Sequence, residues 1–175
     1  MKNIVFITGI SGSGKSYIKD KLIELFPEKY YKIIQYTTRD IRIGEKNAID
    51  YNFISKEDYN AIKHSLFCKT KINGNLYGTP IKLIDNKIAV IVVNSSGLED
   101  GIKYLNGKYN YIVLDIENNS PVKRIDRDEE FIKKEREKIN NVLDRLDSKR
   151  VIKLINDPEH YLNVKDINFI IENSI

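Results

Sequence analysis

A short glycine-rich segment near the start of the chain has the residue types and spacing needed to bind a phosphate chain. Residues 9–16 read GISGSGKS, which fits the pattern G-x-x-x-x-G-K-[ST]. The glycines allow backbone N–H groups to point inward around phosphate oxygens, and the dipole of a following helix favours the anion. Lys15 is expected to reach the β- and γ-phosphates of ATP, and the Ser16 hydroxyl is expected to bind Mg²⁺. The residues expected to bind ATP are Gly9, Ser11, Gly12, Ser13, Gly14, Lys15, Ser16 and Tyr17.

A second group of residues has the chemistry of another phosphate site. Arg39 and Arg42 lie three residues apart beside a glycine turn, as a clamp of two arginines around one phosphate requires. Tyr51 and Tyr77 could donate phenolic O–H groups to the same phosphate. Only seven of the 29 basic residues are arginines, so each arginine is a candidate for a role that needs a planar, bidentate donor.

The elements that must position these residues alternate between strands and helices. Short apolar, β-branched runs predict strands, and apolar residues at helical spacing predict helices. Strands are expected over residues 2–8, 32–36, 51–54, 88–93, 111–115 and 151–155. Helices are expected over residues 16–26, 55–63, 129–146 and 164–175. This alternation predicts an α/β fold with a parallel sheet.

Length and composition exclude several classes of protein. The chain has 175 residues, 41% of them hydrophobic, which predicts one globular domain. A single cysteine and two histidines exclude an internal disulfide framework and a zinc cluster. The net charge of +4 is too small to indicate nucleic-acid binding, and no apolar run is long enough to span a bilayer. We expect a cytoplasmic protein, monomeric or homodimeric, without nucleic-acid or membrane partners.

A phosphate loop alone does not define a reaction, but other patterns narrow the choice. The dinucleotide pattern G-x-G-x-x-G fails because Tyr17 stands at its third glycine. The guanine-reading pattern N-K-x-D of GTPases is absent, and the chain is short for a motor or transport ATPase. A small kinase is therefore the leading class.

Two longer segments then give a family resemblance. Residues 36–55 read YTTRDIRIGEKNAIDYNFIS, and residues 73–80 read NGNLYGTP. Together with the phosphate loop, they resemble the guanylate kinase family, whose members carry T-T-R-x-x-R-x-G-E-x-x-G-x-D-Y-x-F and then G-N-Y-Y-G-[ST]. The resemblance is specific from residue 2 to about residue 97 and looser from there to the end.

The resemblance implies a P-loop nucleoside monophosphate (NMP) kinase fold, with a parallel sheet core flanked by helices, a small NMP-binding subdomain and a lid. On this reading, residues 1–175 form one guanylate-kinase-like domain. The core comprises residues 1–34 and 83–175, the NMP-binding region about 35–82 and the lid about 121–136. The implied reaction is transfer of the γ-phosphoryl group of ATP, with Mg²⁺, to GMP, dGMP or a related nucleoside monophosphate.

Position by position, the resemblance also assigns residues. Lys15, Arg39, Arg42 and the lid arginines are expected to be catalytic, because the transferred phosphoryl group needs positioning and charge neutralisation but no protein base. The lid arginines would be Arg124, Arg127 and Arg136. The residues expected to bind the acceptor are Gln35, Arg39, Arg42, Tyr51, Lys69, Tyr77, Thr79 and Asn94.

Three of these acceptor positions depart from the family. Lys69 aligns best with a glutamate that accepts hydrogen bonds from guanine, and lysine has donors only. Asn94 occupies the position of a second acidic residue of the family, and Gln35 occupies the position of a serine. One hypothesis is that the best acceptor is not GMP, and the other is that Lys69 points to solvent and GMP binds loosely. Two further alternatives are a non-catalytic guanylate-kinase-like module that binds phospho-ligands, and a kinase of a phosphorylated sugar.

Overall fold

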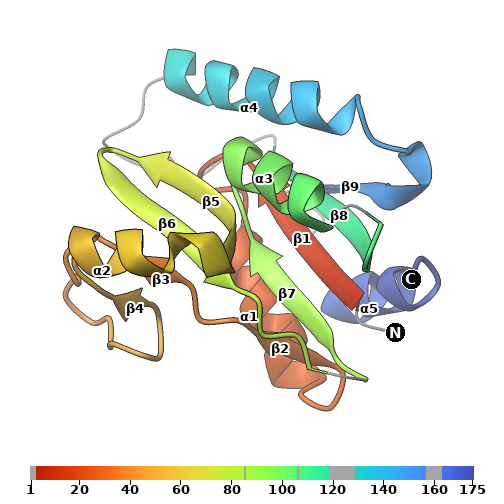
Figure 1. Ribbon diagram of the computed structural model, residues 1–175. Helices are drawn as coiled ribbons and strands as arrows, with labels where there is room; N and C mark the ends of the chain where they lie inside the picture. Colours follow the sequence, from red (N-terminus) through yellow and green to blue (C-terminus); the bar gives the residue numbers. More distant parts are fainter. Residues whose placement is uncertain (1–2, 85, 106, 119–128, 157–162) are drawn as a thin grey trace.

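The computed structural model describes residues 3–84, 86–105, 107–118, 129–156 and 163–175. Within these residues, a five-stranded sheet forms the core, in the order β2-β7-β1-β8-β9 (Figure 1). Its strands are β1 (Asn3–Gly9), β2 (Tyr30–Lys32), β7 (Ile88–Val92), β8 (Asn110–Glu117) and β9 (Val151–Ile155). Every pairing between these strands is parallel, so each connection crosses over a face of the sheet.

Helices cover both faces of this sheet (Figure 1). They are α1 (Lys15–Leu25), α3 (Ser95–Leu105), α4 (Glu129–Leu143) and α5 (Val164–Glu172). Along β1, Ile4 and Phe6 belong to the apolar cluster that includes residues of α3 and α4, whereas Val5 and Ile7 belong to the cluster of α1 and α5. All four side chains are fully buried, and each contributes about 1.5–3 kcal/mol by burial. This alternation fixes β1 at the centre and confirms the predicted fold class.

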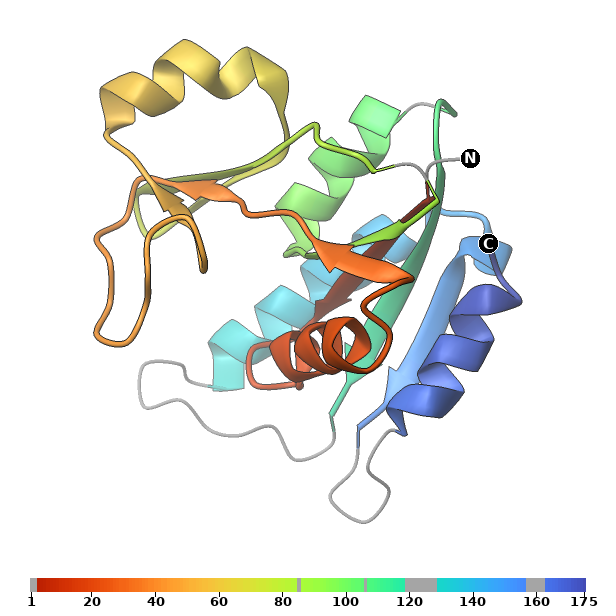
Figure 2. The same ribbon diagram turned by 90° about the horizontal axis from the view of Figure 1, so that it is seen from below.

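A second, smaller sheet has the strand order β4-β3-β6-β5 and lies to one side of the core with α2 (Figure 2). Its strands are β3 (Tyr36–Thr37), β4 (Asn52–Phe53), β5 (Leu66–Ile72) and β6 (Asn75–Pro80). The helix α2 (Lys56–Ile62) begins after Ser55, whose hydroxyl accepts the Asp58 N–H at 3.0 Å. Two short 3₁₀ turns, η1 (Lys63–Ser65) and η2 (Ser148–Arg150), complete the described elements.

The structure corrects the sequence-based prediction in three places. The single strand expected over residues 32–36 is two separate strands, β2 and β3, which belong to different sheets. The hairpin of β5 and β6 and the helix α3 were not predicted. Asn73 and Gly74, with φ of 49° and 80°, form the tight turn of this hairpin, and such an Asn-Gly pair is a hairpin signal that the sequence did contain.

The sequence does not predict helix α3, because its two glycines, Gly97 and Gly101, weaken the helical pattern. The structure gives the reason for Gly101. A Cβ atom there would lie 2.6 Å from the Cys68 sulfur and 3.2 Å from the Phe6 ring, so the glycine lets α3 approach β5 closely.

None of the helices in the described ranges is long and apolar enough to cross a membrane.

The close approach at Gly101 predicts a stability effect. The change Gly101→Ala gains about 1 kcal/mol in helix propensity, but overpacking of a filled core costs about 1–3 kcal/mol. We expect a net loss in the free energy of unfolding, measured by urea denaturation. The double variant Cys68→Ala/Gly101→Ala should recover much of that loss, because the sulfur is the nearest obstacle. A single variant as stable as the parent would contradict this account.

Candidate active site

A cleft of about 550 Å³ runs between the phosphate loop and the second sheet. It is lined by the phosphate loop, by Arg39, Arg42 and Tyr51 of the segment between β3 and β4, and by residues of the β5–β6 hairpin and of the end of β7. Seven residues expected to bind ATP line it: Gly9, Ser11, Gly12, Gly14, Lys15, Ser16 and Tyr17. Ser13, the eighth, is fully buried within the loop.

The phosphate loop connects β1 to α1, and a residue that follows β9 contacts it. Gly14 begins α1 in the left-handed conformation, with φ of 97°, and a Cβ atom there would lie 2.7 Å from the Asn156 amide nitrogen. That nitrogen donates to the Ser13 carbonyl oxygen at 3.0 Å, so the residue that follows β9 braces the loop. The Lys15 ammonium lies over the loop and donates to the Gly9 carbonyl oxygen at 2.8 Å.

An acidic side chain that the sequence analysis did not single out also reaches the phosphate loop. The backbone N–H of Ser11 donates to a Glu135 carboxylate oxygen at 3.0 Å. Glu135 belongs to α4, 124 residues away in the sequence, and lines the cleft. A glutamate among many charged residues of a helix gives no sequence signal, because only the fold decides which side of α4 meets the loop.

Its neighbour Arg136 has a different place from the one expected. The guanidinium donates to both carboxylate oxygens of Asp115, at 2.9 and 2.8 Å, and does not line the cleft. Asp115 is fully buried at the end of β8, and burial raises the pKa of its carboxyl while the charge of Arg136 opposes that shift. The arrangement therefore gives Arg136 a part in fixing α4 on the sheet. Arg124 and Arg127 lie outside the described residues.

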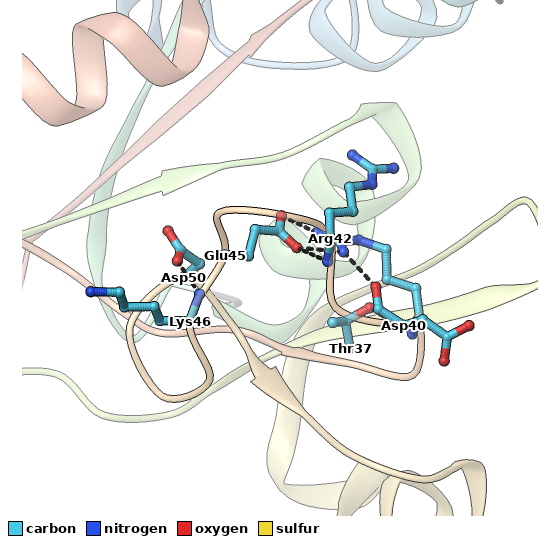
Figure 3. Close-up of polar contacts among 7 residues, drawn as sticks. Thr37, Asp40, Arg42, Glu45, Lys46 and Asp50 are labelled. Atoms are coloured by element: carbon cyan, nitrogen blue, oxygen red, sulfur yellow. Dashed lines mark hydrogen bonds and ion pairs between the residues drawn. The ribbon is translucent and has the colours of Figure 1, made fainter.

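The acceptor side is organised around Glu45 (Figure 3). Its carboxylate accepts two hydrogen bonds from the Arg39 guanidinium, one of them at 2.7 Å, and a third from the Arg42 backbone N–H at 2.9 Å. The Arg39 guanidinium also stacks on the rings of Tyr51 and Phe53, at 5.2 and 5.3 Å from their centres. The hydrogen bonds from Arg39 hold the pKa of the Glu45 carboxyl at about 2.

This network leaves the Arg42 side chain extended away from Glu45 (Figure 3). Arg39, Arg42, Tyr51 and Tyr77 all line the cleft, and the two tyrosine rings lie 6.1 Å apart. Burial is the main cause that raises the pKa of the Tyr51 hydroxyl, so this group remains a donor at neutral pH. The structure thus brings the four predicted acceptor-phosphate residues to one side of one cleft.

The far end of the cleft is lined by neutral polar groups. The Gln35 amide nitrogen donates to the Thr79 hydroxyl at 2.8 Å, and Thr79 is fully buried. The Asn94 amide nitrogen donates to the Thr70 hydroxyl at 3.1 Å, and the Asn94 oxygen accepts the Gly97 N–H at 2.9 Å. Gln35, Thr70 and Asn94 line the cleft, whereas Thr79 supports Gln35 from behind.

The structure places Lys69 away from this end of the cleft. Its ammonium donates to the Leu66 carbonyl oxygen at 3.1 Å and lies 3.6 Å from the Asp100 carboxylate on α3. Cys68 lines the cleft in its place. The cause is a bulge in β5, where the register shifts between Phe67 and Thr70 and Cys68 takes a φ of 53°. A bulge re-aims the side chains that follow it, and neither the sequence nor its spacing reveals one.

The donor set at the phosphate loop suits a magnesium ion bound mainly through phosphate oxygens. Across the described ranges, no group of three or more His, Cys, Asp or Glu residues could hold a metal ion. The cleft does offer the Ser16 hydroxyl. Mg²⁺ in nucleotide sites uses few protein ligands and several substrate and water oxygens, so these residues fit it.

A phosphate loop at the end of the central strand of a parallel sheet shares a cleft with two arginines and a tyrosine of the segment between β3 and β4 and with Tyr77 of β6. This arrangement defines the P-loop nucleoside monophosphate kinase fold. The family model described as "Guanylate kinase" matches residues 1–129. The chain therefore belongs to the guanylate kinase family and is an ATP-dependent nucleoside monophosphate kinase. This confirms the resemblance that the motifs predicted.

Individual relatives agree with this assignment. The guanylate kinase of Campylobacter jejuni is 32% identical over 152 residues, which cover 82% of this chain and 74% of the relative. The guanylate kinase of Helicobacter hepaticus is 36% identical over 101 residues, 54% of this chain and 50% of the relative. The crystal structure of guanylate kinase from Anaplasma phagocytophilum matches with a TM-score of 0.62 at 18% identity, covering 98% of this chain and 84% of that one. That likeness shows the shared fold.

The low pKa of Glu45 predicts how acid affects the protein. A carboxyl whose pKa falls from 4.5 to about 2 on folding stabilises the fold fully above pH 4.5, and this contribution is lost as the pH falls toward 2. Glu45→Gln should lower the melting temperature at pH 6–7, and the difference from the parent should shrink as the pH is lowered through that window. Glu57→Gln, at an exposed position of α2, is the control. A difference independent of pH would contradict the assignment.

Proposed function

We propose that the chain transfers the γ-phosphoryl group of ATP to GMP, dGMP or a related nucleoside monophosphate. The observation that carries this proposal is the single cleft that the phosphate loop shares with Arg39, Arg42, Tyr51 and Tyr77. Its volume of about 550 Å³ falls within the usual range for small-molecule sites. Two phosphate-binding sets in one cleft are what a direct transfer between two phosphates requires.

At the donor end, the loop N–H groups and Lys15 would hold the β- and γ-phosphates. Mg²⁺, held by these phosphates and the Ser16 hydroxyl, would supply charge neutralisation at the transferred group. At the acceptor end, Arg39, Arg42, Tyr51 and Tyr77 would hold the acceptor phosphate in line. The attacking oxygen is already anionic, so the reaction needs no protein base. We propose that Arg124 and Arg127 add positive charge from the lid.

The base of the acceptor would meet neutral groups. Guanine presents N–H donors at N1 and N2, and they need acceptors. In the described cleft, the neutral candidates include the Gln35 amide oxygen and the Thr70 hydroxyl, together with the weakly accepting Cys68 sulfur. Neutral acceptors discriminate less than a carboxylate does. We therefore propose that GMP or dGMP is accepted, as the names of the relatives suggest, but with modest preference over other nucleoside monophosphates.

The first test concerns the donor end. Lys15→Ala should lower kcat by at least about 10²-fold, because a preorganised charge at the transferred group is lost. The melting temperature should change little. The control is Lys21→Ala, whose ammonium pairs with Glu24 at 2.7 Å on the surface of α1. Near-normal turnover by Lys15→Ala, measured with ATP·Mg²⁺ and a panel of nucleoside monophosphates, would overturn the mechanism.

The second test concerns the base. Thr70→Val removes the hydroxyl to which the half-buried Asn94 amide nitrogen donates, and such a hydrogen bond contributes about 0.5–1.5 kcal/mol. We expect the ratio of kcat/KM between GMP and the other monophosphates to change by about fivefold or more. Lys69→Ala should leave this ratio unchanged, because the ammonium faces Asp100. A shifted ratio in Lys69→Ala alone would return base recognition to Lys69.

A further inference from the structure

In the phosphate loop, one backbone N–H group binds a carboxylate of the protein itself. Glu135 offers a carboxylate oxygen to the Ser11 N–H at 3.0 Å, within the cleft. We propose that Glu135 occupies part of the phosphate site and sets the affinity for ATP, because the nucleotide must displace its carboxylate in order to bind. The proposal rests on the proposed function in one respect, that this loop binds the phosphates of ATP.

The donor that Glu135 occupies is one that a phosphate would use. Ser11 lies in the loop between β1 and α1, and its neighbours Gly12 and Gly14 line the same cleft. Backbone N–H groups of such a loop bind anions without regard to their source, since a carboxylate and a phosphate oxygen are both charged acceptors. The carboxylate and the phosphate chain therefore compete for one N–H group and also repel each other.

The packing of α4 on the sheet places Glu135 next to the phosphate loop. The buried residues of this helix are Ile139, Val142 and Leu143, and Glu135 lies four residues before Ile139, on the same stripe. A half-buried glutamate that continues an apolar stripe is placed there by the packing of the helix on the sheet. The double hydrogen bond from Arg136 to the buried Asp115 holds this turn of α4 in position.

The contact also links α4 to ATP binding. In the sequence, α4 follows directly after the stretch that contains Arg124 and Arg127. Displacement of Glu135 by a phosphate group would release one of the contacts between the middle of α4 and the phosphate loop. The carboxylate thus lowers the affinity for ATP, and its displacement changes a contact of α4, whose first half overlaps the predicted lid of about residues 121–136.

The charge of Glu135 can be removed while its shape is kept. Glu135→Gln retains an oxygen that accepts the Ser11 N–H, so the loop should keep its conformation. We expect the Kd for ATP, measured by isothermal titration calorimetry, to fall about three- to tenfold both with and without Mg²⁺. The KM for the nucleoside monophosphate should not change. Glu137→Gln, at an exposed position on the same helix, is the matched control and should leave the Kd unchanged.

Other results would overturn the proposal. An unchanged Kd in Glu135→Gln would make the contact a structural one. Weaker binding only in the presence of Mg²⁺ would make Glu135 a ligand of the metal. Lys15→Ala distinguishes a failure of the role of Glu135 from a failure of ATP binding by the loop. If it abolishes ATP binding while Glu135→Gln has no effect, only the role of Glu135 fails. If the parent chain binds no ATP, the proposed function fails as well.

Discussion

The rest of the structure depends on the burial of β1 at the centre of the core sheet. Its side chains alternate between two apolar clusters, so the strand has no freedom to shift, and the loop that follows it emerges at one fixed place. Two distant residues contact this loop, Asn156 after β9 and Glu135 on α4, and Asn94, just after β7, lines the same cleft. The cleft is therefore a consequence of strand order. In parallel α/β sheets, ligands bind at the carboxyl ends of the strands, where such connections meet.

A second principle is that strong charges in and around the cleft come with partners from the chain itself. Glu45 holds Arg39, Asp115 holds Arg136, and Glu135 caps the Ser11 N–H. Such pairs fix long side chains in one geometry before a substrate arrives, which reduces the ordering cost at binding. They also neutralise charges that would otherwise repel or remain half-buried. The side chain of Arg42, by contrast, extends away from the Glu45 network and lines the cleft (Figure 3).

The lining of the cleft by the phosphate loop and by Arg39 and Arg42 was predictable from the sequence, and its lining by β5 was not. Loop residues such as Lys15, and the pair Arg39 and Arg42, belong to short motifs whose residue types and spacing are local, so the sequence displays them directly. The rest of the lining depends on which side chains of β5 face the cleft. The bulge at Cys68 decides this, and it exchanges Lys69 for Cys68. A one-residue shift in a strand turns every following side chain to the other face, and no local pattern records it.

By itself, the sequence determined the α/β class, most of the core strands and helices, and the two phosphate-binding motifs. Hydrophobic periodicity and glycine spacing are local properties, and they survive in a linear reading. Only the tertiary structure decided which distant residues contact one another around these motifs. It placed the acid of α4 on the phosphate loop, paired Arg136 with Asp115, and packed α3 against β5 through Gly101. Each of these contacts joins residues far apart in the chain, and it exists only because buried apolar faces hold the elements at one spacing.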